Sequence, residues 1–201
     1  MANKLWLLVL SMVLFQSCDK TFNTADELGA YINDPKNGYK LSKSINGIDI
    51  HLLYKPTDML VSQELGDSIN SKRIEDLRNK YYSNIYFSLS ISRNNQELLN
   101  TAQDQDTYLQ MVNKLIFQMN NSIHLISPEK DTLPIIDAIY PRMYGMSNST
   151  NLLIVYPRDK TFLQQKYCDI IVEDIGVGTG DIKFRIDTDI LKKEPVINFQ
   201  Y

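Results

Sequence analysis

The stretch Asn84-Ile-Tyr-Phe-Ser-Leu-Ser-Ile-Ser92 alternates between apolar and polar side chains at every residue. Its odd-numbered positions, from Ile85 to Ile91, are all apolar, and most of its even-numbered positions are polar. Successive side chains of an extended strand point to opposite faces of a sheet, so this period of two predicts a β-strand. We expect one face of this strand to lie in a hydrophobic core and the other to face water.

Further strands are predicted on both sides of this stretch. Residues 39–44 and 48–54 flank Asn46-Gly47, a dipeptide that readily adopts the positive φ angles of a tight hairpin turn. Residues 151–156 are almost continuously apolar, which indicates a central strand. Other candidate strands are 122–127, 132–140, 169–173 and 181–186. Pro134 either places the second of these at a sheet edge or displaces its start.

Three segments have helical spacing of apolar residues, at 24–33, 69–82 and 106–120. The first begins with Thr24-Ala-Asp-Glu27, a capping-box pattern whose hydroxyl and carboxylate satisfy the first free amides of a helix. Residues 57–65 fit either a helix or an irregular crossover. The sequence leaves these two alternatives open.

Together these elements predict a single α+β domain over residues 24–201. We expect a mainly antiparallel sheet of six to eight strands with about three helices packed on it. The apolar runs of period two and period 3.6 alternate too irregularly for a parallel, doubly wound fold.

The first residues predict export. Met1-Ala-Asn-Lys4 is a short cationic start, and Leu5 to Phe15 is an apolar run. This run is shorter than the roughly 20 apolar residues that a membrane-spanning helix needs. Residues 1–17 therefore read as a secretory signal peptide.

Ser17-Cys18 followed by the polar pair Asp19-Lys20 resembles the lipobox of bacterial lipoproteins. The resemblance implies that Cys18 is lipidated and becomes the mature N-terminus, with residues 18–23 as a tether to the membrane. The alternative is an ordinary signal peptide in which Cys18 has no special role.

The charge balance argues against nucleic acid as a partner. The formal net charge is −3 and becomes more negative when Lys4 is removed with the signal peptide. Phosphate binding relies on clustered Lys and Arg, and the sequence has no such cluster.

The sequence predicts no catalytic, cofactor or metal site. Cys168 lies in an apolar strand-like run, which favours a buried structural thiol over a reactive one. The two histidines, His51 and His124, belong to no metal-binding motif and are expected to be packed or surface imidazoles. Gly176-Val-Gly-Thr-Gly180 invites comparison with a phosphate loop, but the residues after it alternate with period two, so we expect a hairpin loop.

Two groups of side chains have a plain and a functional interpretation. Acidic residues recur near the C-terminus and are expected on solvent faces and turns, with an acid–base pair or a calcium site as the alternative. Tyrosines cluster between residues 81 and 86 and are expected to be half-buried, with sugar stacking or a protein interface as the alternative. The acidic residues are Asp169, Glu173, Asp174, Asp181, Asp187 and Asp189, and the tyrosines are Tyr81, Tyr82 and Tyr86.

The lipoprotein-like start, the segment Tyr54 to Leu65 and the acidic, Asn/Tyr/Ile/Lys-rich composition resemble the uncharacterised small lipoproteins of Bacteroidota-type bacteria. The resemblance implies an envelope with two membranes and brings no activity with it.

Our first hypothesis is a non-catalytic protein, lipid-anchored to the outer membrane, that binds another envelope protein or assists assembly. It predicts an exposed apolar or tyrosine-rich patch and no deep polar pocket. The alternative is a surface glycan-binding or glycan-processing lipoprotein, and a third idea is an inhibitor or immunity protein.

Overall fold

A computed structural model describes residues 20–66, 70–142 and 146–200 of the chain. The predicted signal peptide and the predicted lipidation site, Cys18, lie outside the described residues. The predicted α+β class with mainly antiparallel strands is confirmed.

The larger sheet has the strand order β2-β3-β4-β9-β8, and β5 pairs with one end of β4. The predicted hairpin around Asn46-Gly47 is its β2–β3 pair, and the alternating stretch 84–92 is its central strand β4. Leu52, Leu89 and Leu152 lie side by side across three strands and are buried. Its strands are β2 (Lys40–Ile45), β3 (Ile48–Lys55), β4 (Asn84–Arg93), β5 (Gln96–Glu97), β8 (Asp137–Ile139) and β9 (Thr150–Pro157).

A second antiparallel sheet has the order β11-β10-β6-β7, so the strands form two main sheets instead of the single sheet expected. Side-chain periodicity shows which face of a strand is buried but not which strand lies beside it. The two sheets share one core, across which the Tyr156 hydroxyl donates a 3.2 Å hydrogen bond to the Ile123 carbonyl. The strands are β6 (Ile123–Ile126), β7 (Thr132–Leu133), β10 (Tyr167–Val172) and β11 (Ile182–Asp187).

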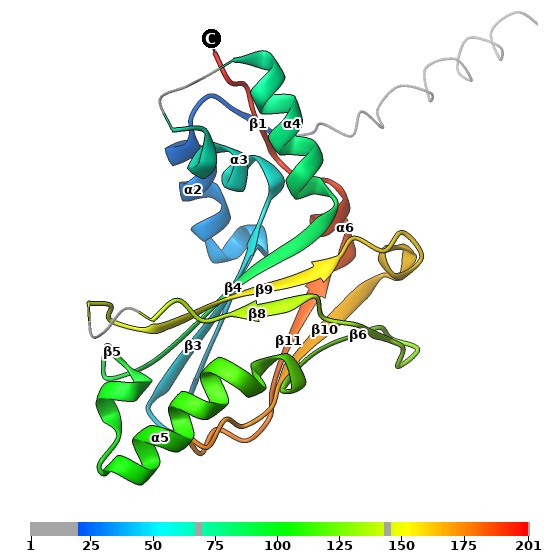
Figure 1. Cartoon of the computed structure of the whole chain (residues 1–201). Helices are drawn as coiled ribbons and strands as arrows, with labels where there is room; N and C mark the ends of the chain where they lie inside the picture. Colours follow the sequence, from blue (N-terminus) through cyan, green and yellow to red (C-terminus); the bar gives the residue numbers. More distant parts are fainter. Residues whose placement is uncertain (1–19, 67–69, 143–145, 201) are drawn as a thin grey trace, which may run out of the picture.

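The helices gather at two ends of the molecule (Figure 1). At one end lie α2 (Ala25–Asn33), α3 (Thr57–Leu65) and α4 (Ser71–Tyr82), and at the other lies α5 (Gln105–Asn113). The Thr24 hydroxyl accepts a hydrogen bond from the Glu27 amide, which confirms the predicted cap of α2. The segment 57–65, which the sequence left open, is a helix.

The predicted helix 106–120 changes its winding along its length. After α5 it continues as a π-helix, η3 (Lys114–Gln118), and ends in a 3₁₀ turn, η4 (Met119–Asn121). This change of winding buries Leu115 and Met119 and leaves Phe117 exposed. A π turn is a local departure from α geometry that hydrophobic spacing does not reveal.

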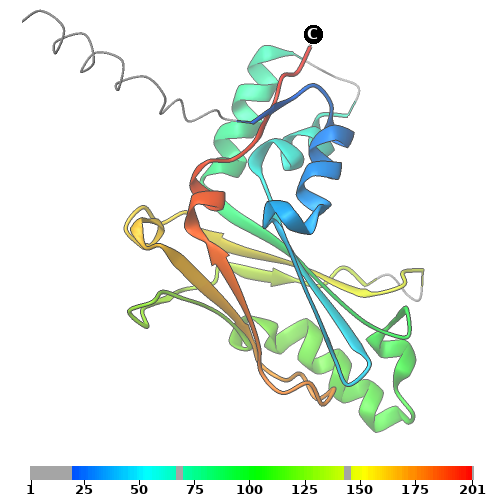
Figure 2. The same ribbon diagram turned by 180° about the vertical axis from the view of Figure 1, so that it is seen from behind.

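The C-terminal segment returns to the helical end of the molecule, as the view from behind shows (Figure 2). After β11 the chain forms a short helix, α6 (Thr188–Lys192), which the sequence did not predict. Strand β12 (Val196–Ile197) then pairs in parallel with β1 (Thr21–Phe22). The remaining 3₁₀ turns are η1 (Pro35–Asn37), η2 (Leu98–Thr101) and η5 (Phe162–Gln164).

A small apolar cluster lies between α3 and α4, separate from the main core, and Phe199 packs against both clusters. Val61, Leu65, Ile74 and Leu77 form this cluster. Within the three described ranges, no helix combines the length and the apolar character needed to cross a bilayer.

Candidate binding surfaces

A buried ion pair joins the end of β9 to the C-terminal segment. Arg158 Nη2 pairs with Glu194 Oε1, and both side chains are only 7% exposed. The Tyr54 hydroxyl donates a hydrogen bond to the same carboxylate oxygen, and the Thr57 amide donates to Glu194 Oε2 at 3.0 Å. Burial and the negative charge of Glu194 raise the pKa of Tyr54 well above its usual value, so this hydroxyl remains a donor.

The same guanidinium also holds three backbone carbonyls. Arg158 Nε donates to the Tyr82 carbonyl at 2.7 Å, Nη1 donates to the Leu191 carbonyl at 2.5 Å, and Nη2 donates to the Asn84 carbonyl at 3.3 Å. These carbonyls belong to α4, α6 and β4. Arg158 therefore links the α4–β4 junction to α6, which lies more than 100 residues later in the sequence.

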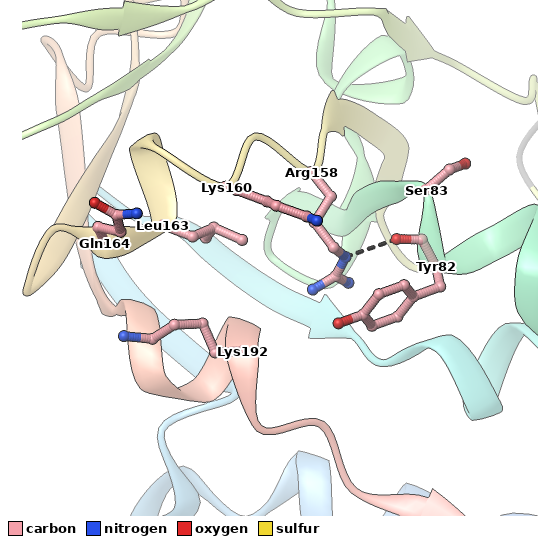
Figure 3. Close-up of a pocket in the computed structure, with 7 residues that line it drawn as sticks. All are labelled: Tyr82, Ser83, Arg158, Lys160, Leu163, Gln164 and Lys192. Carbon is pink, nitrogen blue, oxygen red and sulfur yellow. Dashed lines mark hydrogen bonds between the residues drawn. The ribbon is translucent and has the colours of Figure 1, made fainter.

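Beside this point lies a pocket of about 360 Å³ (Figure 3). Figure 3 shows the Leu163 side chain directed toward Arg158 and Tyr82, with Lys160 above it and Lys192 below it; the ammonium group of Lys192 is turned away from Tyr82. The Tyr82 ring forms a further wall and stacks on Arg158, with 4.4 Å between the guanidinium carbon and the ring centroid. Seven residues line the pocket: Tyr82, Ser83, Arg158, Lys160, Leu163, Gln164 and Lys192.

The rim of this pocket carries an excess of positive charge. Arg158 is balanced by Glu194, whereas Lys160 is exposed to solvent. Lys192 and Lys193 share one carboxylate, that of Asp189, at 2.7 and 3.1 Å. The pocket-lining residues within the described ranges include no carboxylate, and the nearby Asp159 carboxylate accepts the Phe162 amide at 2.7 Å.

A second pocket, of about 300 Å³, lies on the other side of Tyr82 and contains two carboxylates. One is Glu194. The other is Asp58, which forms two hydrogen bonds with Arg78 at 2.8 and 2.7 Å and accepts the Ile197 amide at 2.6 Å. Each carboxylate already binds an arginine and a backbone amide, so this pair stabilises the fold and is a poor candidate for acid–base catalysis.

An apolar surface lies at the other end of the molecule, on α5 and η3. Phe117 is 73% exposed and Leu109 is 53% exposed, and Tyr108 and Ile116 lie on the same segment and are also exposed. We call these four side chains the α5 face. The Tyr108 hydroxyl accepts a hydrogen bond from Arg142 Nη2 at 3.4 Å, so the face has a polar border.

The glycine-rich loop is an anion-binding loop that the chain fills with its own carboxylate. Asp174 Oδ1 accepts the amides of Gly176, Val177 and Gly178 at 2.9 to 3.2 Å, and Oδ2 accepts that of Gly180 at 3.1 Å. Burial opposes ionisation of this carboxyl, but the four amides outweigh it and hold its pKa below the usual value. The loop joins β10 to β11, as a hairpin loop should.

The histidines and the cysteine lie apart from the pockets. His51 Nδ1 is 2.7 Å from the Ser42 hydroxyl, and His124 Nε2 is 2.9 Å from Glu173 Oε1. Cys168 is buried and forms no disulfide within the described residues, and it lies in β10 as the strand pattern predicted. Across the described ranges, no three His, Cys, Asp or Glu side chains are grouped closely enough to hold a metal ion.

The acidic residues near the C-terminus have separate partners. Asp169 forms ion pairs with Lys183 and Arg185 across the β10–β11 pair, and Asp187 caps α6 by accepting the Asp189 amide. Asp181 accepts the amide of Asp174 within the glycine-rich loop. Asp181 and Asp187 act in turns, as the plain interpretation expected, whereas Asp169 is only 6% exposed and lies buried under its two cationic partners.

The three clustered tyrosines also separate. The rings of Tyr81 and Tyr86 pack edge to face at 5.7 Å between their centroids, whereas Tyr82 turns to the pocket. Sequence reasoning identified Tyr82 but missed Arg158 and Glu194. Glu194 meets Tyr54 across 140 residues of sequence, and neither partner belongs to a motif.

Comparison with known proteins finds structural similarity to solved structures at low sequence identity. No protein-family model and no curated protein matches the sequence. One similar crystal structure is a protein of unknown function from Burkholderia pseudomallei K96243, with 12% identity, a TM-score of 0.44 and coverage of 82% of this chain and 86% of that one. Another is a DUF4426 family protein from Pseudomonas aeruginosa PAO1, with 9% identity, a TM-score of 0.37 and coverage of 74% and 94%.

Proposed function

We propose that this chain is a non-catalytic lipoprotein of the cell envelope, anchored to the outer membrane through Cys18, whose folded domain binds a partner protein. The start of the sequence supports the anchor, because Leu5 to Phe15 and Ser17-Cys18 resemble a lipoprotein signal. The proposed relatives are the small lipoproteins of Bacteroidota-type bacteria.

The α5 face carries the protein-binding part of this proposal. Most helices of a folded domain bury an apolar stripe, but no residue of α5 itself is fully buried. Met111 and Val112 pack against the core, whereas Tyr108 and Leu109 are exposed to solvent. Contiguous exposed apolar side chains on a soluble domain mark interaction sites, and aromatic residues are enriched in the centres of protein interfaces. Phe117 is the most exposed side chain of the α5 face, so a partner would bury more of its surface than of the other three.

The chemistry of the face defines the partner as a protein with a complementary apolar surface. We would cross-link the native full-length protein in its membrane and quantify the cross-linked proteins by mass spectrometry. The Leu109→Ser/Phe117→Ser variant should lose a stoichiometric partner that the unchanged protein retains. Val196→Ser replaces a half-exposed apolar residue at the helical end, far from α5, and is the matched control.

The result that contradicts protein binding is a partner profile that is the same for the α5-face variant and the control. Unfolding curves of both variants show whether the domain remains folded. A loss confined to the α5-face variant supports the proposal only if its stability matches that of the unchanged protein.

The anchor is tested separately by intact-mass analysis of membrane-extracted protein. We expect a chain that begins at Cys18 and carries added acyl groups, and a Cys18→Ser variant that leaves the membrane fraction. Each buried methylene of an acyl chain contributes about 0.8 kcal/mol to membrane binding, so the loss of the anchor should release the domain. An unmodified mass for the native protein would contradict the lipid anchor.

The structure gives some support to the binding form of the glycan hypothesis and none to the processing form. The exposed Tyr82 ring beside a pocket favours binding of a small ligand, whereas the carboxylates of Asp58 and Glu194 are occupied by arginines. We therefore keep glycan binding as the second candidate, and a screen of immobilised glycans with Tyr82→Ala as the control would test it.

A further inference from the structure

We propose that the pocket beside Tyr82 binds a small organic anion, namely a carboxylate carried on an apolar or aromatic body. This is a second function, on a surface separate from the α5 face. The two proposals can therefore fail independently.

The size and the lining of the pocket suit such a ligand. Its volume of about 360 Å³ falls within the range of small-molecule sites, which are largely apolar with a few polar groups that orient the ligand. Leu163 and the Tyr82 ring provide apolar surface, and the methylene stems of Lys160 and Lys192 extend it. An apolar body can therefore lie between the two lysines.

The charge of the rim selects an anion. Within the described residues, Lys160 forms no ion pair, and Lys192 and Lys193 each bind one oxygen of the single carboxylate of Asp189, so two positive charges share one negative charge. A ligand carboxylate would supply the missing negative charge and accept hydrogen bonds from the ammonium groups. A neutral ligand of the same shape would gain only the apolar contacts.

The walls of the pocket are fixed before any ligand arrives. Arg158 stacks on the Tyr82 ring and binds the carbonyl of the same residue, and it also binds the Leu191 carbonyl next to Lys192. Arg158 is itself neutralised by Glu194, so it positions the pocket and is not the group that attracts the anion. Little ordering is then required on binding, which favours affinity.

The test is a titration of the full-length protein in lipid nanodiscs with hydrocinnamate, followed by ligand-observed NMR and corrected with empty nanodiscs. Hydrocinnamyl alcohol is the neutral match, because it keeps the aromatic body and lacks the charge. We expect saturable binding of the acid with a dissociation constant on the order of 1 mM. The dissociation constant of the alcohol should be higher by about tenfold or more. Higher salt should weaken binding of the acid, because the lysines are exposed.

The variants Lys160→Gln and Lys192→Gln should each weaken binding of the acid by about three- to tenfold and leave binding of the alcohol unchanged. Lys72→Gln is the matched control, since it removes the same charge from an exposed position outside the pocket. Equal binding of acid and alcohol, no saturation by the acid, or equal effects of the pocket and control variants would each overturn the proposal.

Discussion

Arg158 and Glu194 form an ion pair across the fold, and 7% of each side chain is exposed. Moving two charges out of water is costly, and the cost is recovered only when hydrogen bonds satisfy the remaining donors and acceptors. Here Tyr54, Thr57 and the Leu191 carbonyl supply such bonds. The pair therefore fixes the C-terminal segment against the sheet.

Replacing one member of this pair should destabilise the protein strongly. Glu194→Gln leaves the buried Arg158 charge without its counter-ion, and we expect a loss of about 3–5 kcal/mol in the free energy of unfolding measured by urea. Arg158→Met combined with Glu194→Gln should cost less than the sum of the single changes, because no uncompensated charge remains. Additive costs would contradict the proposed coupling.

An exposed ion pair provides the comparison. Lys80 and Glu64 lie at 2.6 Å, but both side chains are well exposed to solvent. Solvent screens such pairs, so Lys80→Gln should leave the unfolding curve nearly unchanged.

Asp58 should hold the end of the chain in place. Its carboxylate accepts the Ile197 amide and binds Arg78, which in turn donates to the Ile197 carbonyl at 3.0 Å. Asp58→Ala removes the acceptor of the Ile197 amide and the counter-ion of Arg78. We expect the free energy of unfolding to fall by about 3 kcal/mol. In hydrogen-exchange measurements, the variant should show faster exchange at β12, and the Ile197 amide should be affected first. Unchanged exchange there would show that the pairing with β1 suffices alone.

Cys168 should be unreactive in the folded protein. Burial, with the charges of Asp169 and Asp187, raises the pKa of its thiol from 9.0 to about 12. The thiolate is the reactive form, so its fraction at neutral pH falls roughly a thousandfold. In a Cys18→Ser variant, a thiol reagent should label one group only after addition of urea. Rapid labelling without urea would contradict the buried position.

The local elements of the fold were predictable because their causes are local. The alternation in 84–92, the Asn46-Gly47 turn and the Thr24 cap each depend on residues within one element, and the structure contains all three. The division of the strands into two sheets depends on which strands pair. That choice is set by contacts between residues distant in sequence.

The pocket lay beyond sequence reasoning for the same reason. Tyr82, Arg158 and Lys192 come from a helix end, the end of a strand and a short helix that the sequence did not predict. Tyr82 drew attention through the neighbouring Tyr81 and Tyr86, but nothing near Arg158 or Lys192 in sequence suggests a site. Asp174 shows the opposite case. The glycines beside it correctly predicted a hairpin loop, although not the carboxylate that binds the loop amides.

Asp174 should make the stability of the protein depend on pH. Its carboxyl has a lower pKa in the folded state than the ordinary 3.8, because four loop amides bind the ionised form and outweigh the effect of burial. A depressed pKa stabilises the fold above the unfolded-state value, and this stabilisation disappears as pH falls through the folded-state value. Near neutral pH, Asp174→Asn should therefore have a lower melting temperature than the unchanged protein.

The difference between the two proteins should shrink below about pH 4, because the carboxyl then becomes protonated and loses the charge that attracts the amides. Asp76→Asn is the matched control, since it makes the same substitution at an exposed position in α4, outside the glycine-rich loop. Melting temperatures recorded from neutral to acidic pH would check this. A difference in melting temperature that stays constant through the acidic range would mean that Asp174 acts through the shape of the loop. A contribution from its charge would disappear when the carboxyl is protonated.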